Sequence, residues 1–141
     1  MTVLILGATS RIAHQLGYRY AEQGHSICFA ARDLNEANVI AADVALRYQT
    51  TAIARCFDAL DYQEHVGLLA EIEETLGPVT VAILAFGDLG IQDEAQRSFE
   101  HARHIIETNF TGAASLAEVI SSSMEQRQGG TIIGISSVAG D

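Results

Sequence analysis

Short apolar runs alternate along the chain with stretches whose apolar residues recur at helical spacing. The first run, residues 3–6, contains no polar residue, which is typical of a strand buried on both faces of a sheet. Strands that alternate with helices pair in parallel, and the connecting helices cover both faces of the sheet. The chain is therefore predicted to be α/β, a doubly wound parallel sheet that forms one domain over residues 1–141.

The predicted elements follow from apolar spacing and from residues that cap helices. Asp33, with Glu36 three residues later, is predicted to cap the second helix. The expected strands span residues 3–6, 25–31, 51–57, 79–86 and 131–135. The expected helices span residues 12–23, 33–48, 61–76 and 94–124, and a break near the start of the last one is left open.

The turn after the first strand is predicted to bind an anion. Gly7 ends the strand, Thr9 and Ser10 are small, and helical spacing begins at Ile12. A helix that starts directly after a strand presents several unpaired backbone N–H groups at one point, and its dipole adds partial positive charge there. The corner over residues 7–13 therefore suits a phosphate group.

Charge and composition narrow the classes of partner. The formal net charge is −10, so nucleic acid and anionic membranes are not expected partners. No apolar run approaches the ~20 residues of a membrane span, and no signal peptide is visible, so a cytoplasmic location is expected. All eight basic residues are arginine, which excludes lysine chemistry from this chain. Cys28 and Cys56 lie in strand-like runs and are predicted to be buried free thiols.

The turn also resembles a known dinucleotide-binding pattern. Residues 7–13 read GATSRIA and lack the common G-x-G-x-x-G fingerprint. They resemble the G-x-x-x-G-x-G turn of the short-chain dehydrogenase/reductase family, with Arg11 and Ala13 in place of its second and third glycines. An ordinary strand-to-helix turn is the alternative for this motif taken alone.

Further motifs follow in the order that this family has. Asp58, in CFDA, stands where the family places an aspartate against the adenine ring, and Asn109, in ETNFTG, matches the family's long-helix asparagine. Residues 130–140, GTIIGISSVAG, resemble the family's fifth strand, and by this match Ser137 is the catalytic serine. The resemblance covers the whole chain.

The resemblance implies a Rossmann-type sheet of order 3-2-1-4-5 whose C-terminal strands are missing here, and a naturally short protein is the alternative. It implies hydride transfer between a nicotinamide and a carbonyl or alcohol substrate, with Ser137 holding the substrate oxygen and Asn109 supporting a proton path. By the family's pattern the Tyr-x-x-x-Lys pair follows Asp141, outside the chain, and the tyrosines present are expected to be packing residues. The expected cofactor-binding residues are Gly7, Thr9, Ser10, Arg11, Ile12, Arg32, Asp58, Ala59, Ala85, Phe86 and Gly87.

The chain departs from the family after its fourth strand. Where the family has Asn-Asn-Ala-Gly, residues 84–87 read LAFG, so only Gly87 is kept and Phe86 replaces a small residue near the nicotinamide ribose. The segments GATSRIA, AFG and SSVAGD resemble a subgroup of bacterial reductases close to decaprenylphosphoryl-2-keto-ribose reductase. No substrate is read from this narrower resemblance.

Arg32 favours NADP(H) over NAD(H) as the cofactor. An NAD selector is a carboxylate at the end of the second strand, which binds the ribose 2′-OH. Here Ala31 has that position and Arg32 follows, and a guanidinium binds a 2′-phosphate through parallel charge-assisted hydrogen bonds. Arg11 and Ser10 are candidates for the same pocket. The alternative is that Arg32 is a solvated residue at the strand end.

Two hypotheses for the function stay open. The first is an NADP(H)-dependent reductase or dehydrogenase, and the second is a nucleotide-binding module without catalysis that acts as a sensor or scaffold. A methyltransferase that binds S-adenosylmethionine is disfavoured, because Arg32 has no role beside an adenosine that lacks a phosphate.

The predicted helix over residues 94–124 raises two further questions. Its small residues suit a homodimer or tetramer interface, as the resemblance implies, or equally packing on the chain's own sheet. His101 and His104 lie near its start, and they are predicted to be solvated residues rather than metal ligands because no third ligand has a recognisable spacing.

Overall fold

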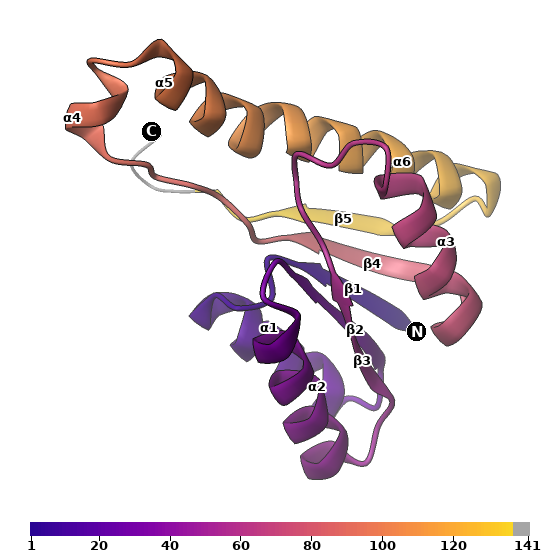
Figure 1. Cartoon of the computed structure of the whole chain (residues 1–141). Coiled ribbons are helices and arrows are strands. Elements are labelled where there is room, and N and C mark those ends of the chain that lie inside the picture. Colours follow the sequence, from indigo (N-terminus) through magenta and orange to yellow (C-terminus); the bar gives the residue numbers. More distant parts are fainter. Residues whose placement is uncertain (137–141) are drawn as a thin grey trace.

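The computed structural model describes residues 1–136, which form one parallel sheet between two layers of helices (Figure 1). The strands are β1 Thr2–Leu6, β2 Ser26–Ala31, β3 Ala52–Cys56, β4 Val79–Leu84 and β5 Thr131–Gly134. Their order is β3-β2-β1-β4-β5, and each pairing is parallel, which confirms the predicted topology. The order reverses between β1 and β4, and open sheets of this kind bind ligands at the carboxyl ends of the strands beside such a reversal.

The helices divide between the two faces of the sheet. One face is covered by α1 Arg11–Glu22 and α2 Leu34–Tyr48, and the other by α3 His65–Leu76 and α6 Ala113–Gln126 (Figure 1). The remaining helical elements are α4 Gln92–Ala95, α5 Phe99–Ile106 and a π-helix, η1 Glu107–Gly112, which joins α5 to α6. Within residues 1–136, every helix is too short or too polar to span a bilayer.

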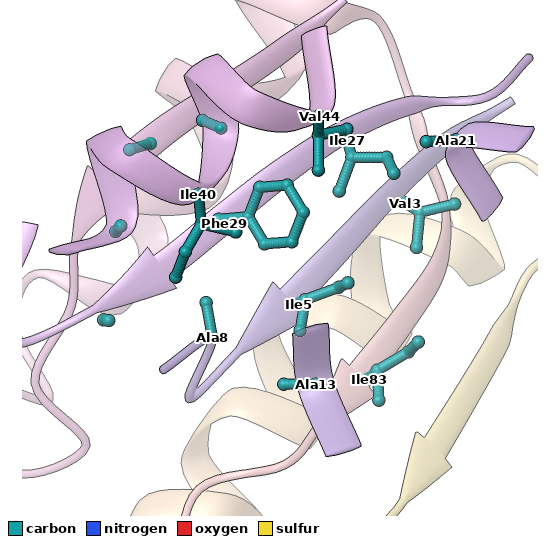
Figure 2. Packing of buried hydrophobic residues seen from close by; sticks show 14 of the residues in the cluster. Val3, Ile5, Ala8, Ala13, Ala21, Ile27, Phe29, Ile40, Val44 and Ile83 are labelled. Atoms are coloured by element: carbon teal, nitrogen blue, oxygen red, sulfur yellow. The ribbon is translucent and has the colours of Figure 1, made fainter. Parts of the chain in front are cut away.

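Strand β1 is buried along its whole length and holds the two layers together. Val3 and Ile5 pack with Phe29 in the cluster beneath α1 and α2 (Figure 2), whereas Leu4 and Leu6 belong to the cluster beneath α3 and α6. Each such side chain contributes about 1.5–3 kcal/mol when it is fully buried. This two-sided burial explains why the first run of the sequence has no polar residue.

The third helix begins later than predicted. It starts at His65 rather than at Asp61, because the preceding residues form turns. The Asp61 N–H donates to the Asp58 carbonyl at 3.2 Å, and the Glu64 N–H donates to the Asp61 carbonyl at 3.0 Å. The turns place His65, a polar residue, at a fully buried position.

The predicted helix over residues 94–124 is interrupted after Ala95. Ser98 then caps a new helix, since its hydroxyl accepts a hydrogen bond from the His101 N–H at 3.4 Å. The helical path runs on from Phe99 through the π-helical segment to Gln126. Its small-residue face is only partly covered, since Ala113 and Ala117 are half-buried while Ala114 and Ser121 are exposed.

The prediction that both cysteines are buried is wrong for Cys56. Cys28 is buried in β2, but Cys56 is exposed, because it is the last residue of β3, the edge strand. Burial raises the pKa of the Cys28 thiol to about 12. Only Cys56 is therefore expected to react with thiol reagents at neutral pH.

Titration with Ellman's reagent at pH 8 is expected to modify one thiol in the native chain and both after denaturation. Cys56→Ser should abolish the native signal, whereas Cys28→Ala should keep it. Modification of two thiols in the native chain would contradict the burial of Cys28.

Gly17 lies where α1 crosses the ring of Phe29. A Cβ at this position would lie 2.5 Å from Phe29 Cε1 and 2.6 Å from its Cζ, and Phe29 is fully buried. We expect Gly17→Ala to lower the free energy of unfolding by about 1–3 kcal/mol, because overpacking forces a buried ring to move. Urea denaturation measures this change.

Gly67→Ala is the matched control, because Gly67 lies in α3 with open space around its Cα. It is expected to raise the free energy of unfolding by about 0.4–1 kcal/mol through the lower entropy of the unfolded chain. Equal effects of the two substitutions would show that Phe29 does not constrain α1.

Candidate functional site

A cavity of about 340 Å³ lies at the carboxyl ends of the strands, beside the reversal of strand order. It receives residues from the turn after β1 and from the segments after β2, β3 and β4, and from α5 and η1. The lining residues are Gly7, Thr9, Ser10, Ala31, Arg32, Asp33, Phe57, Asp58, Ala59, Leu60, Ala85, Phe86, Gly87, Asp88, His104 and Thr108.

The turn after β1 uses several of its amides within the protein. The N–H groups of Gly7 and Ala8 both donate to the Ala30 carbonyl, at 2.9 and 3.1 Å. The Ser10 N–H donates to the Gly7 carbonyl at 3.3 Å, and the Ser10 hydroxyl accepts from the Ala13 N–H at 3.2 Å. These amides are therefore used within the protein and are not available to a ligand.

Three amides of the same corner remain available to an anion. Within residues 1–136, the N–H groups of Thr9, Arg11 and Ile12 have no hydrogen-bond partner. Thr9 lines the cavity, and Arg11 and Ile12 are the first residues of α1, where the helix dipole is positive. The side chains of Arg11 and Ile12 are exposed and do not line the cavity. Only the backbone N–H groups of these two residues are therefore available to bind an anion.

Gly7 brings the turn against the end of β4. Its φ is +86°, and a Cβ there would lie 2.6 Å from the Phe86 nitrogen and 2.7 Å from its Cα. Any other residue would be strained at this position, both by the positive φ and by the close contact with Phe86. Glycine is thus the one residue that lets the floor of the cavity close between β1 and β4.

Arg32 and Asp33 form the cavity wall after β2. The Asp33 carboxylate accepts a hydrogen bond from the Glu36 N–H at 2.9 Å, which confirms the predicted cap of α2. Arg32 is exposed and forms no ion pair with any residue in the described part of the chain. Its guanidinium is available to an anionic ligand.

The segment after β3 is held tightly against η1. The Asp58 carboxylate accepts a hydrogen bond from the Leu60 N–H at 2.9 Å, while the carboxylate itself stays exposed beside the cavity. Ala59 is buried, and a Cβ at Gly112 would lie 2.6 Å from its carbonyl oxygen. The close approach of Gly112 therefore fixes the position of this wall.

The segment after β4 supplies the opposite wall. The Ala85 N–H donates to the Leu6 carbonyl at 2.8 Å, which extends the sheet pairing by one residue. The ring of Phe86 lies edge-on to the ring of Phe57, with 5.2 Å between centroids. Phe86 thus joins the ends of β3 and β4 across the base of the cavity, with Gly87 following at the rim.

Asn109 does not line the cavity but holds its rim. Its side-chain amide donates to the Asp88 carbonyl, and its Oδ1 accepts from the Asp88 N–H, both at 2.7 Å. Asn109 lies on η1, next to Thr108, which does line the cavity. Wider helical turns of this kind are frequent at functional sites.

The two histidines near this rim lie close to carboxylates of the same chain. His104 Nε2 lies 3.6 Å from the Asp88 carboxylate, and His101 Nδ1 lies 3.6 Å from the Glu94 carboxylate. Among residues 1–136, no three His, Cys, Asp or Glu side chains are arranged to hold a metal ion. The other predicted catalytic residue, Ser137, lies outside the described residues.

Sequence reasoning missed seven residues that line the cavity. Five of them directly adjoin predicted site residues at the strand ends, so extending each predicted strand end would have found them: Ala31, Asp33, Phe57, Leu60 and Asp88. His104 and Thr108 reach the cavity from α5 and η1, and no motif in the sequence indicates this.

A family model described as short chain dehydrogenase matches residues 1–141, the whole chain. The chain belongs to the short-chain dehydrogenase family. An uncharacterized oxidoreductase of Mycobacterium tuberculosis strain H37Rv is 33% identical over 138 residues, which are 98% of this chain and 55% of the relative. The chain therefore spans about half the length of the curated relatives it matches.

Solved structures agree with this membership. A short-chain type dehydrogenase/reductase from Mycobacterium marinum superposes with a TM-score of 0.90 at 28% identity, over 99% of this chain and 56% of its own. A variant of actinorhodin polyketide ketoreductase, solved with NADPH, gives a TM-score of 0.90 at 26% identity, over 99% and 54%. Among solved structures with this fold, some contain NADPH and others NAD⁺.

Asn109→Ala should loosen the rim of the cavity. Loss of both hydrogen bonds to Asp88 is expected to speed exchange of the Asp88 amide by about tenfold or more, since each bond contributes about 0.5–1.5 kcal/mol. Hydrogen–deuterium exchange measures this rate. The Gly7 amide, bonded to the Ala30 carbonyl, is the internal control and should not change. An unchanged rate at Asp88 would contradict the role of Asn109 at the rim.

Proposed function

We propose that this chain is the cofactor-binding portion of an NADP(H)-dependent oxidoreductase of the short-chain dehydrogenase type. The observation that carries the proposal is the convergence of three features on one cavity. These are the amide-rich turn at Thr9, the guanidinium of Arg32 and the carboxylate of Asp58. They come from the ends of adjacent strands, where a dinucleotide binds in sheets of this topology.

Each part of the cavity suits a different part of NADP(H). The available amides of Thr9, Arg11 and Ile12 would bind the pyrophosphate at the N-terminus of α1. Arg32 would bind the 2′-phosphate, and its lack of an ion pair within residues 1–136 supports this assignment. Asp58, at the end of β3, would accept a hydrogen bond from the adenine ring, as the family resemblance implies.

The nicotinamide and the carbonyl substrate would lie at the opposite end of the cavity. NADPH, when bound, supplies a hydride from the nicotinamide to a carbonyl carbon. Asn109 holds the Asp88 backbone at this end, and by the family resemblance it also supports proton transfer. Ser137 is proposed to hold the substrate oxygen, and the catalytic tyrosine and lysine of the family do not lie within this chain.

A binding module without catalysis is the second candidate, because Arg11 and Ala13 replace two glycines of the family's turn and residues 84–87 read LAFG in place of Asn-Asn-Ala-Gly. Turnover of NADPH with a panel of ketones separates the two, measured on this chain and on any longer product of the same reading frame. Hydride transfer by neither would favour the binding module. We also propose that the chain is related to the decaprenylphosphoryl-2-keto-ribose reductase subgroup. This relationship does not identify a substrate.

A homodimer or tetramer through the segment from α5 to α6 is also proposed. Phe99, Ile106 and Phe110 are 57–79% exposed along this segment, and the small residues Ala114 and Ser121 continue the exposed face. An exposed apolar stripe of this kind is typical of an interface. A cytoplasmic location remains part of the same proposal.

Arg32→Ala tests the assignment of the cofactor. The affinity for NADPH is expected to fall by about 10- to 100-fold, because a charge-assisted hydrogen bond contributes about 1.5–3 kcal/mol. The affinity for NADH should stay the same, since it has no 2′-phosphate. Fluorescence titration of each reduced dinucleotide measures both constants.

Arg19→Ala is the matched control, because Arg19 is an exposed arginine of α1 that pairs with Glu22 and does not line the cavity. This variant should bind NADPH like the wild type. Equal affinities for NADPH and NADH in the wild type and in Arg32→Ala would contradict a 2′-phosphate site.

A further inference from the structure

We infer that His65 is a positioning residue for the adenine end of the cavity, an inference that rests on the proposed function. His65 is 1% exposed and begins α3, beneath the segment that follows β3. Its Nε2 lies 3.1 Å from the Asp58 carbonyl oxygen, and its Nδ1 lies 2.9 Å from the Ser115 hydroxyl of α6. His65 therefore connects the part of the cavity wall that contains Asp58 to helix α6.

The hydrogen bonds fix the tautomer of the ring. A carbonyl oxygen only accepts, so Nε2 carries the hydrogen and donates it to the Asp58 carbonyl. In the neutral ring, Nδ1 then accepts from the Ser115 hydroxyl. Both ring nitrogens are paired, so the buried imidazole leaves no polar atom unsatisfied.

The same bonds fix the orientation of Asp58. Its carbonyl accepts from two donors, His65 Nε2–H and the Asp61 N–H, and so both of its lone pairs are used. Its carboxylate is separately held by the Leu60 N–H. Asp58, which lines the cavity, is therefore held both at its carbonyl and at its carboxylate.

Ring contacts extend this support to the base of the cavity. The His65 ring lies 6.1 Å from the ring of Phe57 and 5.9 Å, edge-on, from the ring of Tyr62, measured between centroids. Phe57 in turn contacts Phe86 from the end of β4. His65 thus supports both Asp58 and Phe57 at the end where adenine would bind.

The test compares His65→Gln with His65→Asn. The side-chain amide of Gln reaches the position of Nε2 and can donate to the Asp58 carbonyl, whereas that of Asn reaches only the position of Nδ1, next to Ser115. The two variants remove the same aromatic ring and differ in which hydrogen bond they keep. The probe is 2′,5′-ADP, the adenine half of NADP(H), and calorimetric titration gives its dissociation constant.

His65→Asn is expected to weaken binding of 2′,5′-ADP by about tenfold, and His65→Gln by less than about threefold. Exchange of the Leu60 amide should also be faster in His65→Asn than in His65→Gln, while exchange of the Gly7 amide should stay equal. The exchange readout needs no ligand and separates local positioning from general loss of stability.

Equal affinities of the two variants, or equal exchange at Leu60, would overturn the role of His65. If the wild-type chain and His65→Asn bind 2′,5′-ADP equally well, the inference about His65 is contradicted but the proposed function is not. A wild-type chain that does not bind 2′,5′-ADP contradicts the proposed function instead.

Discussion

The contact between Gly7 and the end of β4 is the constraint on which the site depends. Its +86° φ and its approach to the Phe86 backbone allow the chain to leave β1, turn beneath the strand ends and enter α1. Because β1 is buried on both faces, its end cannot move away from this contact. The position of the amides at the start of α1 is therefore set by the sheet core, some of whose side chains Figure 2 shows.

The sheet could be predicted from the sequence because its signals are local. Unbroken apolar runs such as residues 3–6 mark buried parallel strands, and the Asp33 cap marks the start of α2. Cys56 shows the limit of this reasoning. Its run is largely apolar apart from Arg55, but the edge position of β3 leaves its end exposed, and edge positions depend on strand order rather than on local composition.

Site residues that directly follow a strand could be predicted from the sequence, whereas those that α5 and η1 bring to the cavity could not. Arg32, Asp58 and Phe86 line the cavity as their places after the strands indicate. The side chains of Arg11 and Ile12 do not, because the first turn of α1 directs them to solvent. The amides of Gly7 and Ala8 bond to the Ala30 carbonyl, a contact between separate strands that no short motif reports.

The π-helix between α5 and α6 sets the relative rotation of two helices that share one axis (Figure 1). A residue in an α-helix turns by about 100°, since there are about 3.6 residues in each turn. If the same residues of Glu107–Gly112 formed a regular α-helix, α5 would be rotated by about 100° relative to α6. His104 and Thr108 would then turn away from the cavity while Leu116 and Ile120 stayed against the sheet. The length of this one turn therefore determines which residues of the preceding helix a ligand meets.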